Sequence, residues 1–301
     1  MTIISSQSYK EKFDNLISDN NISDEEFIST IGSLVYQVPL GAMQKAIPFI
    51  VRTSLLDKDE VCQNISRCTY APDFLKEKIP LQRCNLKGQQ CFYASIPGMM
   101  VNFSDGAQPS LMETTAQKII DDPTFDARHA VASRWQIKKQ PLFWYLTHHD
   151  HSKKNNENFK FLFNETNDFL KEEELTTNNY QNFTEKLQYL SELFCRNDNK
   201  ENVYRITATY YNNVIELFKP FNSSYDGLIY PSANTKGEGM NIVLTKDYVD
   251  KENIYCDLVV LYEINRNPRD IKNVRFTPIA HAKPDEFGNI DFKPLSKNIL
   301  L

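Results

Sequence analysis

Residues 225–244, with the sequence YDGLIYPSANTKGEGMNIVL, decide how the second half of this chain folds. Asp226 and Gly227 form a turn signal, and the apolar run after them predicts a short strand that Pro231 ends. Residues 241–244 predict the partner strand. Ser232 is therefore expected on a loop just past a strand end, where small polar groups often meet ligands. Taken alone, this segment is an ordinary strand–turn–strand unit.

Short apolar runs and helical periodicity alternate in blocks on both sides of that unit. Apolar residues at steps of three and four predict helices in the first 45 residues, at 110–120, and three times between about 150 and 220. Ser23, followed three residues later by Glu26, fits a capping box. This order of blocks predicts an α+β fold rather than a regular βαβ alternation. The remaining strands are expected at residues 48–52, 91–95, 133–137, 142–146, 255–264 and 275–280.

Composition limits the class of protein. The chain has 301 residues, of which 41% are hydrophobic and 24% charged. These fractions exclude a disordered chain, a collagen and a heptad rod. The net charge of −5 makes non-specific binding to nucleic acid or to an anionic membrane unfavourable. Because neither a secretory signal nor a run of about 18 apolar residues is visible, we expect a cytoplasmic protein without a membrane span.

Cysteine and histidine patterns give no metal site. The six cysteines contain no CxxC spacing, so reduced and mostly buried thiols are expected. His148, His149 and His151 form the one histidine cluster, and it lacks the i,i+4 spacing of zinc-binding helices. A solvated loop is the preferred interpretation of this cluster. Phosphate loops, dinucleotide-binding glycine motifs and serine-nucleophile elbows are absent from the sequence.

Two further segments allow a structural and a functional interpretation. Arg83 and Asn85 precede the predicted strand at 91–95, and the forked donors of an arginine there match phosphate oxygens. The plainer alternative is an ion pair at the surface or the edge of the core. Ser110 and Glu113 fit the two ends of a capping box. The alternative for Glu113 is a carboxylate that stabilises developing positive charge.

Taken together and in this order, the three segments resemble the RES domain family. The family carries an Arg-x-Asn segment before a tyrosine-containing strand, then a helical glutamate, then a YDGIRYPS-like segment. Here these are QRCN…CFYAS, SLMETTAQ and the stretch at 225–244. The resemblance spans about residues 48–264, and Gln82 stands where the family usually has glycine. The family also has an upstream arginine, for which Arg52 ranks first and Arg67 is the competitor.

The resemblance implies a fold similar to the ADP-ribosyltransferase toxins, with NAD as the substrate and with neither metal nor cofactor. The expected organisation is an N-terminal helical extension, residues 1–45, and a RES core of short strands, residues 46–301, with a helical insertion at about 150–220. It implies catalytic roles for Glu113, Arg83 and Tyr93, and substrate-binding roles for Arg52, Arg67, Ser232 and Asn85.

The implied activity is cleavage of the nicotinamide–ribose bond of NAD. Its transition state resembles an oxocarbenium ion, and a carboxylate near the ribose, Glu113, would stabilise it. Arg83 and Arg52 would hold the pyrophosphate, Tyr93 the nicotinamide or ribose, and Ser232 the ribose or phosphate. Such an enzyme, an NAD glycohydrolase or phosphorylase, would be a toxin with a cognate antitoxin as partner.

Two alternatives remain open at this point. One is an ADP-ribosyltransferase that modifies a protein, and the other is an inactive nucleotide-binding module. The two N-terminal helices are amphipathic and must bury their apolar faces, against a second copy in a homo-oligomer, an antitoxin or their own domain. We expect them to cover the site or to mediate oligomerisation.

Overall fold

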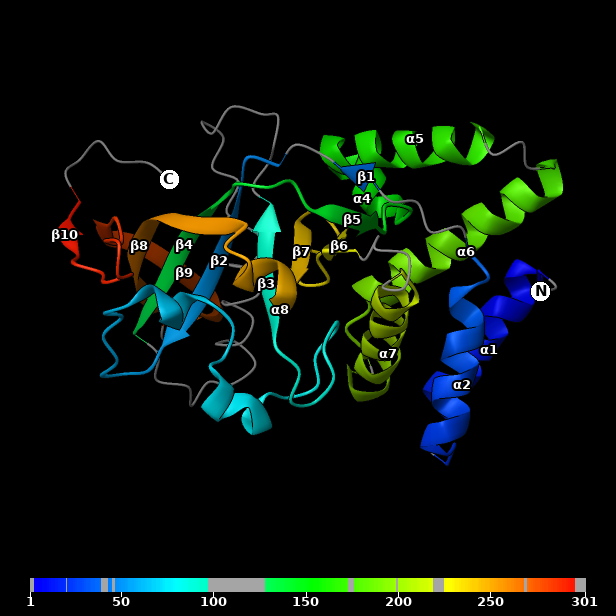
Figure 1. The fold of residues 1–301 in the computed structure, drawn as a ribbon, viewed down its shortest axis with the longest axis horizontal. Coiled ribbons are helices and arrows are strands. Elements are labelled where there is room, and N and C mark those ends of the chain that lie inside the picture. The colour runs from blue at the N-terminus through cyan, green and yellow to red at the C-terminus, as the bar shows by residue number, and fades with distance from the viewer. Residues whose placement is uncertain are drawn as a thin grey trace.

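A computed structural model describes residues 3–19, 21–38, 43–44, 47–96, 128–172, 176–198, 200–218, 225–267 and 270–295. Within these ranges the chain has an α+β fold in which one mixed sheet is flanked by helices (Figure 1). The α+β class predicted from the sequence is therefore confirmed. No helix in these ranges has the length and apolar character that crossing a membrane requires.

The sheet joins the described strands in the order β1-β5-β6-β7-β3-β2-β4-β8-β9-β10. All neighbours are antiparallel except β5 and β6, which run parallel. The strands are β1 (Met43–Gln44), β2 (Phe49–Leu56), β3 (Cys91–Ile96), β4 (His129–Ile137), β5 (Leu142–Tyr145), β6 (Gly227–Pro231), β7 (Met240–Thr245), β8 (Ile254–Asn267), β9 (Asp270–Ala282) and β10 (Lys293–Pro294). Each strand that we predicted from an apolar run is present.

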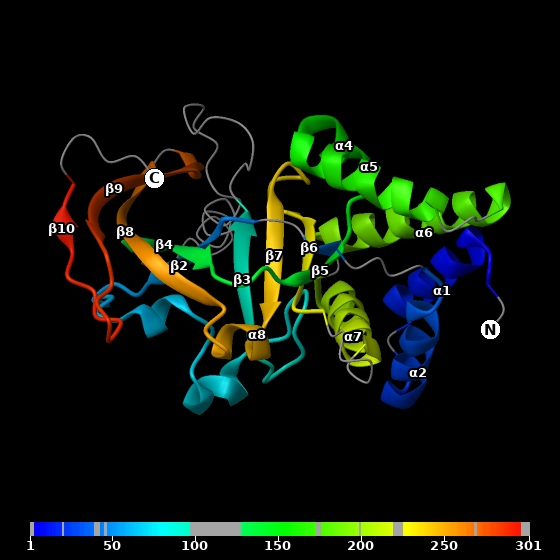
Figure 2. The same cartoon turned by 45° about the horizontal axis from the view of Figure 1, so that its top comes forward.

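The helices gather around one half of the sheet, as the two views show (Figures 1 and 2). Two 3-10 helices, η1 and η2, lie in the segment between β2 and β3. The helices are α1 (Ser6–Ser18), α2 (Asp24–Val35), η1 (Ile65–Cys68), η2 (Asp73–Lys78), α4 (Asp150–Asn155), α5 (Glu157–Glu172), α6 (Thr177–Cys195), α7 (Lys200–Phe218) and α8 (Lys246–Asp250). The predicted helix at 110–120 lies outside the described residues.

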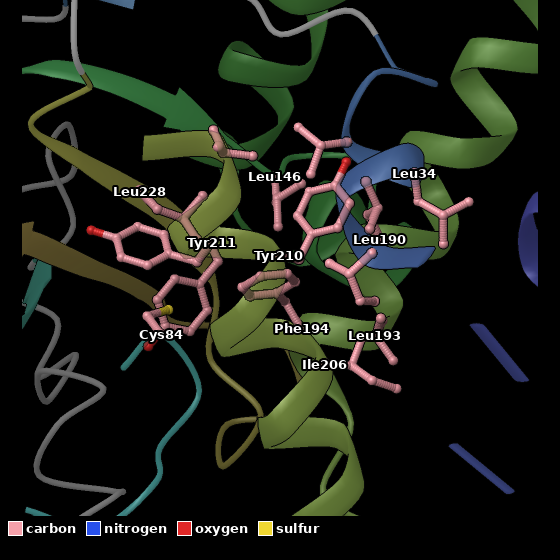
Figure 3. Packing of buried hydrophobic residues seen from close by; sticks show 14 of the residues in the cluster. Leu34, Cys84, Leu146, Leu190, Leu193, Phe194, Ile206, Tyr210, Tyr211 and Leu228 are labelled. Atoms are coloured by element: carbon pink, nitrogen blue, oxygen red, sulfur yellow. The ribbon is translucent and has the colours of Figure 1, made fainter. Parts of the chain in front are cut away.

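The helical side of the molecule has one continuous core. Leu190, Leu193 and Phe194 of α6 pack with Ile206 and Tyr210 of α7 (Figure 3). The same cluster takes in residues of α1 and α2 and reaches Leu228 and Val243 on one face of the sheet. On the opposite face, Phe159 and Leu162 of α5 join Ile229 and Ile242. The sheet is thus covered on both faces where β6 and β7 lie.

The two N-terminal helices bury their apolar faces against α6 and α7 of the same chain. Tyr9 and Phe13 are fully buried, and the Tyr9 hydroxyl lies 3.3 Å from that of Tyr210. Asn202 of α7 donates to the carbonyl of Ile17. The side chain of Ser23 caps α2 by accepting from the amide of Glu26, as the capping-box pattern predicts. The partner of these helices is therefore their own chain.

The histidine cluster differs from the solvated loop that we expected. His148 is fully buried, and its ring meets Phe163 edge-on at 4.9 Å. His149 caps α4 by accepting from the amide of Ser152. The charged and polar neighbours of His148 in the sequence give no sign of this packing, because the residue that covers it, Phe163, comes from α5. Burial lowers the pKa of His148 to about 4, so the ring is neutral at physiological pH.

His148 should make the folded state sensitive to acid. Its folded pKa of about 4 lies below the usual 6.5, so the unfolded state binds the additional proton between these values. Stability contributed by the neutral ring is present above pH 6.5 and is lost as the pH falls toward 4, by up to about 3 kcal/mol. Denaturant unfolding of the native chain and of His148→Gln at pH 7 and pH 4.5 checks this. An equal acid-induced loss in both proteins would contradict it.

Candidate functional site

The sheet is nearly divided between β2 and β3. β2 pairs with β4 from Phe49 to Leu56, and β3 pairs with β7 from Cys91 to Ile96. Among the described residues of β2 and β3, however, Val51 and Ser95 are the single pair in register. In Figure 2, β3 and β7 run side by side, while β8, on the other side of β2 and β4, crosses the view at an angle. Strands β2 and β3 therefore diverge beyond this pair.

A cavity of about 270 Å³ opens where β2 and β3 diverge. Arg52 lies on the β2 side and Tyr93 on the β3 side. The segment between the two strands, which includes Asn85, closes the remaining wall. Three of the residues selected from the sequence are thus brought together here. The other polar lining comes from Tyr70, Lys78, Gln82, Gln89 and Gln90.

Arg52 on β2 and Lys78 at the end of η2 are the positively charged residues that line this cavity. Nη1 of Arg52 donates to the backbone carbonyl of Tyr93 at 2.7 Å, and its guanidinium lies 5.4 Å from the centre of the Phe92 ring. Its buried Nε has no hydrogen-bond partner, and no described carboxylate forms an ion pair with it. Burial lowers the pKa of Arg52 to about 10, so the group stays charged at neutral pH. An uncompensated cation beside a cavity favours an anionic ligand.

Tyr93 and Asn85 form a saturated hydrogen-bonded unit. The Tyr93 hydroxyl accepts from the amide of Cys84 and donates to Oδ1 of Asn85, both at 2.9 Å. The Asn85 amide donates in turn to the carbonyls of Pro80 and Leu86. Burial raises the pKa of Tyr93 well above its usual value. Tyr93 is therefore suited to holding the loop in place and lining the cavity. It is not suited to proton transfer.

Arg83 points to helix α6 and does not line the cavity. It is 7% exposed, and its Nη2 donates to the carbonyl of Arg196 at 2.8 Å. Nη1 makes a longer contact of 3.5 Å with the carbonyl of Leu193, and the guanidinium lies 5.0 Å from the Tyr204 ring centre. Carbonyls at a helix C-terminus attract a cation because they carry partial negative charge. Arg83 thus ties the segment before β3 to the end of α6.

Replacing Arg83 by methionine should destabilise the protein by about 2–4 kcal/mol, because two helix-end carbonyls lose a charged donor in a buried place. Urea unfolding measures the effect. Arg67→Met is the matched control, since that exposed side chain pairs with Glu60 at the surface and should cost less than about 1 kcal/mol. If Arg83→Met and the native chain were equally stable, the bonds from Arg83 to the end of α6 would not stabilise the fold, which would contradict this prediction.

Ser232 is fully buried just after β6, as the turn pattern predicts for its place in the chain. Its backbone accepts from the amide of Gly237 at 2.7 Å and donates to the carbonyl of Gly239 at 2.8 Å. Its carbonyl also receives a 3.8 Å contact from Sγ of Cys195. The hydroxyl of Ser232 has no hydrogen-bond partner among the residues that the structure describes. Ser232 and Arg83 therefore both contact the C-terminal end of α6, and neither lines the cavity at Arg52.

The two upstream arginines behave differently. Arg67 is an exposed residue of η1 that pairs with Glu60 and donates to the carbonyl of Leu55. It does not line the cavity, whereas Arg52 does. Glu113 lies outside the described residues. The sequence analysis missed Gln89 and Gln90, although their place directly before a predicted strand could have drawn attention to them.

All six cysteines are free, and four of them are buried, as expected. No group of three or more potential metal ligands occurs among the residues that the structure describes. Comparison of the chain with protein-family models, with curated proteins and with solved structures finds no match.

Proposed function

We propose that this chain binds NAD at the divergence of β2 and β3 and cleaves its nicotinamide–ribose bond. The observation that carries the proposal is Arg52, a partly buried cation without a carboxylate partner in the described structure, at the wall of a polar cavity. A pyrophosphate supplies the missing negative charge. The RES-like order of Arg83, Tyr93, Glu113 and Ser232 supports NAD as its source, in an ADP-ribosyltransferase-like fold.

The chemistry requires few groups. Bond cleavage releases neutral nicotinamide from a cationic precursor, so no general acid is needed. Positive charge spreads over the ribose in the transition state, and Glu113 stabilises it in this proposal. Attack by water yields ADP-ribose and one proton. Attack by inorganic phosphate yields ADP-ribose 1″-phosphate instead.

Within this proposal the remaining residues have different tasks. Arg52 binds the pyrophosphate, while Tyr93 and Asn85 shape the wall beside it. Arg83 positions the segment that carries Asn85 through its bonds to α6. Loss of cellular NAD would make the protein a toxin, and the resemblance implies an antitoxin that neutralises it.

The test is nicotinamide release from NAD by the purified full chain, measured by chromatography with and without phosphate. Release equal to the loss of NAD is expected, and dependence on phosphate would identify a phosphorylase. Intact NAD under both conditions would refute cleavage. Radiolabelled NAD added to a cell extract tests the transferase alternative, because label would then remain on a protein.

A further inference from the structure

A second and larger cavity adjoins the first. Its volume is about 580 Å³, and it lies between the segment before β3, helix α7 and the start of α8. Figure 1 shows the segment leading into β3 passing between α7 and α8. Gln89, Gln90 and Cys91 line both cavities. The two cavities are therefore adjacent and are separated by the short segment 89–91.

The walls of this second cavity combine aromatic, amide and apolar surfaces. Tyr211 and Tyr225 are each 1% exposed and form its floor with Ile215. Figure 3 places Tyr211 on the side of the core that carries Cys84 and Leu228. The Tyr211 hydroxyl has no hydrogen-bond partner within the described structure. Gln89 and Asn212 bond to each other through their side-chain amides at the wall.

The lining of the cavity carries three lysines, Lys76, Lys87 and Lys246, and two acidic residues, Glu216 and Asp247. Lys76 and Lys87 are exposed residues of the rim, and neither forms an ion pair with a described residue. Lys246 forms an ion pair with Asp250. Its ammonium group also lies 5.1 Å from the ring centre of Tyr70, which lines the first cavity. Lysine ammonium groups at the mouth of a pocket suit phosphate. Asp247 at the same rim offers a carboxylate of the kind that binds ribose hydroxyls.

We propose that this second cavity binds a nucleoside monophosphate, with the base against the tyrosine floor and the phosphate at Lys76 and Lys87. The volume lies within the range of about 300–1,000 Å³ typical of small-molecule sites, whereas the first cavity falls just below it. One source of the ligand is the AMP half of NAD, and this assignment rests on the proposed function. The other source is free AMP.

Calorimetric titration of the full chain with AMP tests the proposal without any NAD turnover. Binding is expected, and Lys87→Ala should weaken it about five- to tenfold, the loss typical of one charged hydrogen bond at a partly exposed site. Leu86→Trp, which fills the exposed mouth, should weaken it further. Lys12→Ala is the control, because that exposed lysine lies on the distant helix α1. Unchanged AMP affinity in both cavity variants would overturn the proposal, as would no binding at millimolar AMP.

Steady-state kinetics then distinguish the two sources. AMP that raises the apparent KM for NAD without changing kcat identifies the AMP half of the substrate. AMP that binds and leaves the KM for NAD unchanged identifies a site for the free nucleotide. Nicotinamide release without AMP binding would overturn this inference alone. AMP binding to a chain that leaves NAD intact would overturn the proposed cleavage and keep the nucleotide site.

Discussion

Glu113→Gln should lower kcat for nicotinamide release by about 10²–10³, with little change in the KM for NAD. The substitution keeps the size and hydrogen-bonding shape of the side chain and removes its negative charge. In the proposed reaction that charge acts on the oxocarbenium-like transition state, where positive charge reaches the ribose ring. The ground state keeps its positive charge on the nicotinamide, so binding depends on Glu113 much less.

The matched control for this prediction is Glu157→Gln. Glu157 is an exposed glutamate in the first turn of α5, where it faces Lys160. The Glu157→Gln substitution removes the same charge from a residue that lines neither cavity, so kcat should stay native. A Glu113→Gln variant with native kcat would remove Glu113 from catalysis and favour its capping-box interpretation. Equal losses in both variants would indicate a general effect of charge.

Local patterns in the sequence were sufficient for most secondary structure. The strands at Cys91–Ile96 and Gly227–Pro231 follow from short apolar runs bounded by turn residues, and α6 follows from apolar residues at helical spacing. Ser23 as a helix cap also follows from its neighbours. These signals act over a few residues, which is the range that a single sequence displays.

The arrangement of the site depended on contacts between distant parts of the chain. Arg83 bonds to a carbonyl 113 positions further on, and nothing near Arg83 in the sequence indicates that partner. The cavity at Arg52 exists because β2 and β3 share one registered pair, which is a property of the whole sheet. Which of Arg52 and Arg67 lines this cavity therefore could not be read from the sequence. The expectation that His148 lies in a solvated loop was wrong for the same reason, since the residue that covers it, Phe163, lies in helix α5.

Arg52→Met should lower kcat/KM for NAD by about 100-fold, mostly through KM. The guanidinium lies at the first cavity without an ion pair to any described carboxylate, and a pyrophosphate would form charge-assisted hydrogen bonds with it. Two such bonds at about 1.5 kcal/mol each correspond to a loss of this order. Arg52→Lys should recover only part of the activity, because an ammonium group keeps the charge and lacks the planar fork.

The same substitution should leave stability unchanged or raise it, and this sign separates substrate binding from a structural role. Removing a partly buried cation that lacks a described carboxylate partner relieves its desolvation penalty, which offsets the lost bond to the Tyr93 carbonyl. Arg134 on the neighbouring strand β4 is the matched control. Its guanidinium forms a bidentate ion pair with Asp257, with hydrogen bonds of 2.9 and 2.8 Å.

Arg134→Met should therefore show the opposite pattern, with a lower melting temperature and native kcat/KM. Thermal unfolding and NAD kinetics on both variants provide the measurement. If Arg52→Met loses stability as Arg134→Met does and keeps its activity, Arg52 is a structural residue and the cavity does not bind NAD through it. A loss of activity with intact stability leaves substrate binding as the reason why this sheet holds an unpaired arginine at the point where its strands diverge.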